Sequence, residues 1–327
     1  MRWLSSFKPD NFTLAIVGAV IVASFLPAVG VAATILHYVT IFAIALLFFL
    51  HGARLSREAA LAGALHWRLH LIVLCATFVL FPILGLFLRK TLGYVLPDSL
   101  LLGVLFLCLL PSTVQSSIAF TSIAHGNVAA AVCSASLSNL LGIFITPALV
   151  ALLMNLKGGV SIDAVWDIVL QLLVPFIAGH LLRPWIGNFV ARHRYALGYV
   201  DRGSILLVVY LAFSEAVAQG LWHVLGVGEL IKLLIVCALL LAAVLLATVV
   251  VARRLGFERA DEIVIVFCGS KKSLASGVPM AGVLFPLAQV GMIVLPLMLF
   301  HQIQLMVCAA LARRYAASDQ GAKAAAE

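Results

Sequence analysis

Charged residues are scarce in this chain of 327 amino acids, where aspartate, glutamate, lysine and arginine together make up 10% of the sequence. A soluble domain carries roughly 25%. The chain also lacks any long polar stretch that could form a separate soluble domain. It is 64% hydrophobic, with a mean hydropathy of +1.17. Because about 20 apolar residues in a helix cross a bilayer, the composition predicts an all-α integral membrane protein, with residues 1–327 forming one transmembrane domain.

Two kinds of motif are absent as well. No G-x-x-x-x-G-K-[ST] sequence occurs, so ATP-driven transport by this chain is not expected. The six cysteines lie inside apolar runs and none forms a C-x-x-C pair, which indicates buried thiols rather than a disulfide framework or a metal centre. No cofactor is expected, and the coupling ion is left open between sodium and a proton. The basic residues lie in short loops beside apolar runs, which indicates membrane topology rather than nucleic-acid binding.

Ten apolar segments can be drawn along the chain. Their approximate bounds are 12–28, 32–50, 69–88, 99–124, 127–153, 164–185, 203–221, 229–252, 262–284 and 287–312. With ten crossings, 15 of the 21 lysines and arginines lie on the side of the N-terminus and four lie on the opposite side. By the positive-inside rule, this asymmetry predicts a multi-pass protein of the inner (plasma) membrane with both termini in the cytoplasm.

A weak internal repeat divides the sequence into two halves. The stretch LIVLCATFVL (Leu71–Leu80) resembles LLIVCALLLA (Leu233–Ala242), at an offset of about half the chain. Since each half holds five segments, an odd number, the halves would have opposite orientations in the membrane, as in many transporters. We therefore expect inverted repeats at residues 1–157 and 158–315, followed by a polar tail at 316–327 that is frayed or disordered.

One apolar segment in each half is interrupted by small and polar residues. In the first half, Pro111 removes a backbone donor and is followed by five polar residues: Ser112, Thr113, Gln115, Ser116 and Ser117. In the second half, the stretch FCGSKKSLASGVP (Phe267–Pro279) holds Ser270, Lys271, Lys272 and Ser273, and its two lysines carry the only charges between Ile263 and Ala310. The simpler interpretation is that proline and serine only kink these helices. However, paired interruptions at matching positions favour a central binding site, because lipid cannot satisfy broken backbone.

These stretches resemble the bile acid:sodium symporter family, in particular its branch of uncharacterised bacterial sodium-dependent transporters. The resemblance is carried by IALLFFLHGARLSREA (Ile44–Ala59), PSTVQSSIAFTSIAHGNVAAAVCSASLSNLLGIFITP (Pro111–Pro147) and FCGSKKSLASGVPMAGVLFP (Phe267–Pro286), and similarity extends over nearly the whole chain. It implies ten helices in two inverted five-helix repeats, whose broken fourth and ninth helices cross near the membrane centre. It also implies a panel of helices 1, 2, 6 and 7 that moves against a core of helices 3–5 and 8–10.

The sequence departs from the family at the ion site. In sodium-coupled members, the ninth-helix break carries a glutamate and, four residues later, a glutamine that bind sodium. Aligning the shared glycine with Gly269 places Phe267 at the first position and Lys271 at the second. The hydroxyl positions of the fifth helix fall on Ala131 and Ala135, although other polar residues lie nearby: Ser134, Ser138 and Asn139. A lysine would repel sodium, so the resemblance implies the fold and transport but argues against sodium coupling.

The lysine pair has two interpretations. An ammonium at the crossing could replace the charge of the missing sodium ion, neutralise an anionic substrate or exchange a proton, or it could only pair with a carboxylate. Glu215 is a second candidate site residue, because a carboxylate inside a membrane segment needs a cationic partner; its alternative is snorkelling to the interface. His301 and Gln302, in the cluster His301-Gln302-x-Gln304, are candidates to face the crossing.

The sequence and the resemblance together predict a secondary carrier of a small organic anion that works by alternating access in the lipid bilayer, and not an enzyme. The alternatives within transport are proton-coupled and uncoupled carriage. Outside this class, adjacent serine and lysine residues leave an intramembrane Ser/Lys hydrolase to consider, as well as a channel or a receptor. The resemblance implies that a monomer is sufficient. The sequence does not identify the substrate.

Overall fold

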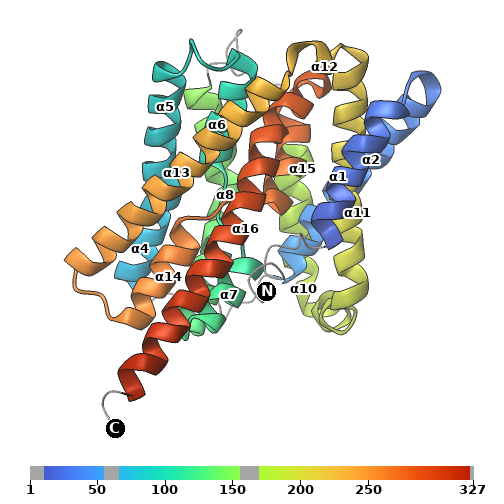
Figure 1. Ribbon diagram of the computed structural model, residues 1–327. Helices are drawn as coiled ribbons and strands as arrows, with labels where there is room; N and C mark the ends of the chain where they lie inside the picture. The colour runs from blue at the N-terminus through green and yellow to red at the C-terminus, as the bar shows by residue number, and fades with distance from the viewer. Residues whose placement is uncertain (1–10, 55–65, 155–168, 325–327) are drawn as a thin grey trace.

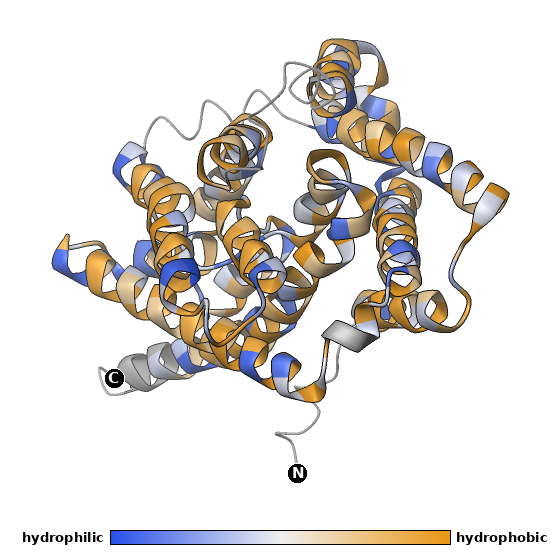
Figure 2. Ribbon diagram, turned by 90° about the horizontal axis from the view of Figure 1, so that it is seen from above, coloured by the Kyte–Doolittle hydropathy of each residue, from blue (hydrophilic) through white to orange (hydrophobic). Residues whose placement is uncertain are grey.

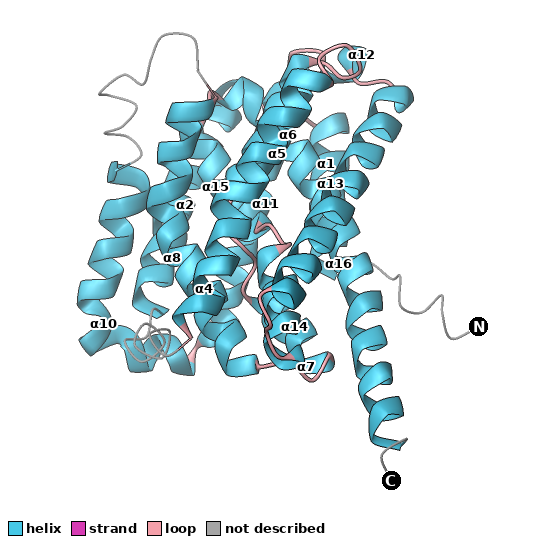
Figure 3. Ribbon diagram, turned by 90° about the vertical axis from the view of Figure 1, so that its left-hand side faces the viewer, coloured by secondary structure: helices cyan, strands magenta, loops and turns pink. Residues whose placement is uncertain are grey.

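The computed structural model describes residues 11–54, 66–154 and 169–324, and within these ranges every regular element is a helix (Figures 1 and 3). The first half contains α1 (Asn11–Phe25), α2 (Gly30–Arg54), α4 (Trp67–Cys75), η2 (Ala76–Leu80), α5 (Phe81–Thr91), α6 (Asp98–Leu109), α7 (Gln115–Ile123) and α8 (Val128–Leu153). The second half contains η3 (Val169–Leu173), α10 (Val174–Arg192), α11 (Arg194–Ala218), α12 (Leu221–Val224), α13 (Val227–Arg254), α14 (Arg259–Gly269), α15 (Leu274–Leu284) and α16 (Leu287–Ala324). The two η elements are π-helical turns.

Each of the ten predicted apolar segments contains helix. Seven stretches among the described residues are long and apolar enough to cross a membrane, and the shorter apolar helices Leu14–Phe25 and Asp98–Leu109 accompany them. Large apolar side chains such as Phe25, Phe42 and Trp185 are exposed on the outside of the bundle. Figure 2 shows that apolar residues predominate throughout the helices. Exposed apolar side chains of this kind are expected on a surface that faces lipid.

The C-terminal stretch differs from the expectation, and the expected repeat boundary cannot be compared with the structure. The stretch 316–327 was expected to be frayed or disordered, and this is wrong up to Ala324, because α16 continues to that residue. Alanine is the strongest helix former, and the helix simply continues from its apolar part into this stretch. The expected boundary between the two repeats, at residues 157 and 158, lies outside the described residues.

The helices form two groups that lie side by side in Figure 1. In the first, α2 packs along α10 and against α11, and α11 in turn packs against α1. In the second, α6 packs between α5 and α16, α13 packs against α14 and α16, and α4 packs against α8 and α14. The groups meet where α11 contacts α15 and α16.

Glycine brings α2 and α10 into close contact. A Cβ atom at Gly52 would overlap the carbonyl oxygen of Phe176, and one at Gly179 would overlap the carbonyl oxygen of Phe49. Small residues let membrane helices approach closely, so that dispersion forces act along the backbones. The pair α2 and α10 is therefore held as one unit, and it forms one wall of the cavity described below.

Candidate functional site

Two interrupted helices meet inside the bundle. Helix α6 ends at Leu109 and α7 begins at Gln115, while α14 ends at Gly269 and α15 begins at Leu274. Figure 3 shows loop segments at mid-height between the helices. Ser112 Oγ donates to the carbonyl oxygen of Cys268 at 2.6 Å, and Ser117 Oγ donates to that of Phe267 at 3.0 Å. In the other direction, the N–H of Ser273 donates to the carbonyl oxygen of Pro111 at 2.9 Å. The two breaks thus satisfy each other's backbone.

The carbonyl groups at the end of α6 and in the break that follows have hydrogen-bond donors from other parts of the chain. Five successive carbonyl oxygens, from Cys108 to Ser112, accept hydrogen bonds. Their donors, in order, are Lys272 Nζ, Thr146 Oγ1, Lys272 Nζ again, the N–H of Ser273, and Asn139 Nδ2. The last carbonyl groups of a helix have no partner within the helix, and lipid offers none. Two side chains of α8 and two residues of the second break therefore make this interruption tolerable.

Lys272 is the residue that joins three backbone segments. Its Nζ donates to the carbonyl oxygens of Thr77 at 2.8 Å, Cys108 at 2.9 Å and Leu110 at 2.7 Å. An ammonium group has three donors, so all of them are used. The ring of Phe81 covers the group at 4.0 Å from its centroid, a cation–π contact. The side chain is completely buried.

The carbonyl oxygen of Thr77 is available because of the π turn η2. The N–H of Phe81 donates to the carbonyl oxygen of Ala76, five residues earlier, and not to that of Thr77. In a regular α-helix the latter would be its partner. The π turn thus frees one carbonyl group on α4–α5 and points it into the core. π turns are frequent at functional sites.

Lys271 has a different environment. Its Nζ lies 4.0 Å from the ring centroid of Phe120 and 5.3 Å from that of Phe267. It has no hydrogen-bond partner among the described residues, although the side chain is completely buried. The two neighbouring lysines therefore have different surroundings. Lys272 Nζ lies among carbonyl oxygen atoms, whereas Lys271 Nζ lies beside two aromatic rings.

This arrangement changes two expectations about the lysine pair. The resemblance placed Lys271 at the ion-binding position, but the oxygen ligands surround Lys272. Pairing with a carboxylate is also not seen, because no ion pair to either lysine forms within the described residues. Adjacent residues in a break point in different directions, and alignment by sequence cannot tell which one faces the oxygen atoms.

An amide side chain from the next long helix, α8 or α16, holds each break. On α8, Asn139 Nδ2 donates to the carbonyl oxygen of Ser112 at 2.6 Å, and Ser138 Oγ accepts from the N–H of the same residue at 3.0 Å. On α16, Gln304 contacts both backbone groups of Lys272, at 2.9 Å each. Hence Ser112 in the first break and Lys272 in the second each have their N–H and C=O bound by side chains of the next long helix.

Most of the other predicted site residues serve the breaks structurally. Thr113, Ser116 and Ser117 bond to one another, Ser273 caps α15 by accepting from the N–H of Ser276, and Ser270 Oγ donates to the carbonyl oxygen of Val266. That bond and the aromatic surroundings of Lys271 give no support to a Ser/Lys hydrolase. Ser134 on α8 bonds to His70 Nδ1 at 2.7 Å.

Three predicted residues lie at the margin of the site or away from it. His301 Nδ1 lies 2.8 Å from Gln304 Nε2, so this ring reaches the crossing through Gln304. Gln302 is half-buried on the same helix, α16. Glu215 accepts a hydrogen bond from Gln219 on its own helix, α11, and lines neither cavity described below.

A cavity of about 300 Å³ lies between the two helix groups. One wall comes from α2 and α10, with Phe48, His51, Arg54 and Phe176. The opposite wall comes from the breaks and α8, with Val114, Gln115, Ser136, Asn139, Leu140, Ile143, Ser276 and Met280. Asn139 Oδ1 accepts from Ser276 Oγ at 2.8 Å, which ties the crossing to the cavity wall.

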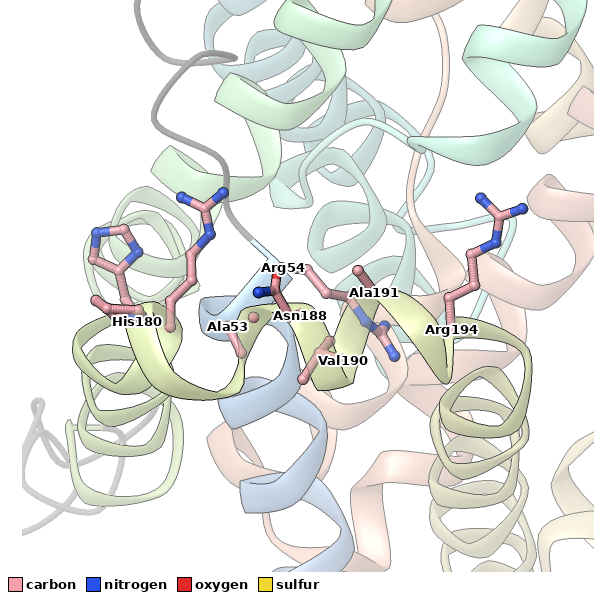
Figure 4. A pocket seen from close by; sticks show the side chains of 10 residues that line it. Ala53, Arg54, His180, Asn188, Val190, Ala191 and Arg194 are labelled. Carbon is pink, nitrogen blue, oxygen red and sulfur yellow. The ribbon is translucent and has the colours of Figure 1, made fainter.

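A second, larger cavity of about 560 Å³ shares Arg54 with the first (Figure 4). Its other polar lining residues are His180, Arg183, Asn188 and Arg194, from α10 and the start of α11. We call this cavity the basic vestibule. Arg54 forms an ion pair with Asp201 at 2.5 Å, which orients the guanidinium group where the two cavities meet.

The sequence did not indicate three important residues as site residues. Arg54 was counted only as a topology signal, and Thr77 contributes a backbone atom that leaves no mark in the sequence. Gln304 was visible in the cluster His301-Gln302-x-Gln304, and a glutamine on an apolar helix was the available signal. Its neighbours were selected instead, because nothing in the sequence fixes the rotation of a long helix.

The comparisons with known proteins agree with this architecture. The SBF-like CPA transporter family matches residues 10–317. An uncharacterised protein of Pseudomonas aeruginosa is 61% identical over 321 residues, covering 98% of this chain and 96% of its own. YfeH of Escherichia coli, named as a candidate symporter, is 58% identical over 94% of this chain and 92% of its own. Sodium/bile acid cotransporter 7 of Rattus norvegicus is 28% identical, with the same two shares. The chain thus belongs to the SBF-like CPA transporter family and is a multi-pass membrane protein.

Proposed function

We propose that the protein is a secondary carrier of a small organic anion that works by alternating access. The observation that carries this proposal is the 300 Å³ cavity, because it lies between two helix groups and touches both helix breaks. Gln115 begins α7 and Ser276 lies in the first turn of α15, and both line the cavity. Rocking of one group against the other would expose such a site to each side in turn.

Charge favours an anion as the substrate. Arg54 and His51 stand on one wall, and the basic vestibule adds Arg183 and Arg194 on the path to it. Gln115 and Ser276 lie in the first turns of α7 and α15, so the positive ends of two helix dipoles lie at the cavity. No aspartate or glutamate lines either cavity within the described residues. The volume lies at the lower end of ligand pockets, about 300–1,000 Å³, which favours a compact anion.

The inverted-repeat architecture is part of the proposal. We propose ten crossings in two repeats, with α1, α2, α10 and α11 as the panel, and with both termini in the cytoplasm. Support comes from the matching hydrogen bonds of Ser112 and Lys272. The N–H and C=O of Ser112 are bound by side chains of α8, and those of Lys272 by a side chain of α16. In this orientation the basic vestibule opens to the cytoplasm. One chain contributes all the residues of the cavity, so a monomer would be sufficient.

Sodium coupling at the crossing is not part of this proposal. The names of several relatives attach sodium and bile acids to those proteins, but here an ammonium group fills the oxygen-rich position. Proton coupling through Lys271 and uncoupled carriage are the two remaining mechanisms. Lys271 favours the former, because its Nζ is buried and has no hydrogen-bond partner among the described residues.

Transport by reconstituted protein tests the proposal. Proteoliposomes would be offered labelled anions of three classes: a small keto acid, an aliphatic sulfonate and a bile acid. We expect saturable uptake and counterflow of at least one compact anion, unchanged when sodium replaces choline. Arg54→Gln should reduce uptake at least about tenfold, the loss expected for one charged contact of 1.4 kcal/mol or more.

Arg192→Gln is the matched control, because Arg192 is exposed on α10 and lines neither cavity. It removes the same charge and should leave uptake unchanged. Uptake that depends on sodium would contradict the coupling assignment. A linear, non-saturable flux without counterflow would identify a channel instead of a carrier. If an imposed pH gradient drives uptake and Lys271→Met abolishes that effect, the proton-coupled mechanism holds.

A further inference from the structure

The surroundings of Lys272 Nζ have the composition of a cation site. Three carbonyl oxygens lie 2.7–2.9 Å from the nitrogen, and an aromatic ring covers it at 4.0 Å. The oxygen atoms of this cage are main-chain carbonyl groups of Thr77, Cys108 and Leu110, so a substitution at position 272 removes none of them. Two of the oxygens belong to the end of α6, where the helix dipole favours a positive charge.

We propose that this cage is a monovalent-cation site and that the Lys272 ammonium is a cation tethered permanently within it. An ammonium group and a small cation satisfy carbonyl oxygens in the same way, by presenting positive charge at hydrogen-bond or coordination distance. The tether explains why a completely buried lysine needs no carboxylate. Its charge balances the partial charges of three carbonyl groups that neither lipid nor the helices themselves satisfy.

The cage predicts a size preference. Its oxygen atoms are spaced for an ammonium nitrogen at 2.7–2.9 Å. Free ammonium and potassium have nearly the same radius, whereas sodium is smaller and draws its ligands closer. If the side chain is shortened, the emptied cage should therefore bind ammonium and potassium better than sodium, and should exclude choline.

The tether also has a consequence for transport, and this part alone rests on the proposed function. A free ion enters and leaves its site in each cycle and so contributes the energy of its gradient. A tethered cation does not leave, so no gradient acts through this site. Uptake by the wild-type protein should be indifferent to potassium and ammonium, whereas uptake by Lys272→Ala should require one of them.

The direct experiment needs no substrate and is independent of the proposed function. Purified wild type, Lys272→Ala and Lys271→Ala would be unfolded thermally in ammonium, potassium, sodium and choline chloride at matched ionic strength. Lys272→Ala should unfold at the lowest temperature in choline and should recover with rising ammonium or potassium. The expected shift is on the order of 3 °C at a tenfold excess of ion over Kd.

Lys271→Ala is the control, since it removes an adjacent buried ammonium that has no oxygen ligands. It and the wild type should respond to the four salts alike. The proposal would be overturned if the unfolding temperatures of all three proteins changed equally among the four salts. It would also be overturned if rising choline raised the unfolding temperature of Lys272→Ala as ammonium and potassium are expected to do.

If Lys272→Ala is not recovered folded, Lys272→Gln replaces it, because the neutral amide can still donate two hydrogen bonds. Thermal unfolding of this variant below the wild type supports the need for a positive charge, whereas equal stability refutes it.

Discussion

Ser112 and Lys272 occupy the same position in the two helix breaks. Each is the third residue after the preceding helix ends, at Leu109 and at Gly269. Each has its N–H and its C=O bound by side chains of the next long helix, which are Ser138 and Asn139 for Ser112 and Gln304 for Lys272. Only their side chains differ, and that difference supplies the positive charge at the crossing.

The two lysines are expected to have opposite effects on stability. Lys271→Met removes a buried ammonium that lacks an oxygen partner and should raise the free energy of unfolding, by about 1–4 kcal/mol if it follows other buried charges replaced by apolar groups. Lys272→Met should lower it by several kcal/mol, because three carbonyl oxygens lose their donor at about 1–3 kcal/mol each. Thermal unfolding of the two variants in the same detergent measures both effects. Similar losses in both variants would contradict these assignments.

Asn139 should be coupled energetically to Ser276. Asn139→Ala leaves the carbonyl oxygen of Ser112 without this donor and removes the acceptor of Ser276 Oγ, so we expect a loss of about 1–3 kcal/mol. A double-mutant cycle with Ser276→Ala should give a coupling energy of about 0.5–3 kcal/mol. Asn188→Ala, in the basic vestibule, serves as the control and should be additive with Ser276→Ala. Additivity of the Asn139 and Ser276 variants would argue against their contact.

Close approach of α2 and α10 predicts a sharp difference between two glycines. Gly179→Ala places a Cβ against the backbone of Phe49 and should destabilise the protein by more than about 1–3 kcal/mol, the usual cost of overpacking. Gly198→Ala, within α11, meets no atom within 4 Å and should stabilise it by up to about 1 kcal/mol. Unfolding temperatures of the two variants provide the measurement. A tolerant Gly179 would mean that α2 and α10 separate easily.

The basic vestibule should act mainly on the rate at which the anion arrives. Arg183→Glu and Arg194→Glu reverse the charge along the path and should raise KM, with the largest effect at low ionic strength, because salt screens such attraction. Arg254→Glu is a suitable control, since it reverses a charge at the end of α13, away from both cavities. Initial uptake rates at low and high salt would show the difference. An effect that does not change with ionic strength would point to direct binding instead.

Sequence reasoning located the helices and both breaks correctly. Each of the ten apolar segments contains helix among the described residues, and the polar clusters after Leu109 and Gly269 mark the places where helix stops. Apolar length and breaker residues are local properties, so a single sequence reveals them. Gln115 was selected because it follows the first break, and Ser138 and Asn139 because the resemblance places a site near them. In the structure, Ser138 and Asn139 hydrogen-bond to Ser112, and Gln115 lines the smaller cavity.

The features of the site that could not be predicted depend on the direction in which a side chain points. Whether Lys271 or Lys272 faces oxygen atoms is decided by the backbone angles of a four-residue break, which no periodicity describes. Arg54 lies at the end of its helix, where arginine usually marks the cytoplasmic side, so the topology signal concealed its place beside a cavity. Gln304 required the rotation of α16, and this is set by packing against α6 and α13 rather than by the residues of α16.

The π turn Ala76–Leu80 has a consequence for how this region tolerates insertions and deletions. A π turn holds one residue more than an α turn, so each residue after it is rotated by about 100° relative to an uninterrupted helix. Phe81 and Gly85 follow this turn and are buried, so a regular turn in its place would rotate both away from their present positions. Deleting Val79, which is exposed on this turn, would shorten it to a regular one and turn Arg89 and Lys90 to a new side. The extra residue of the π turn therefore decides which side chains of α5 face the core, and its presence matters more than its identity.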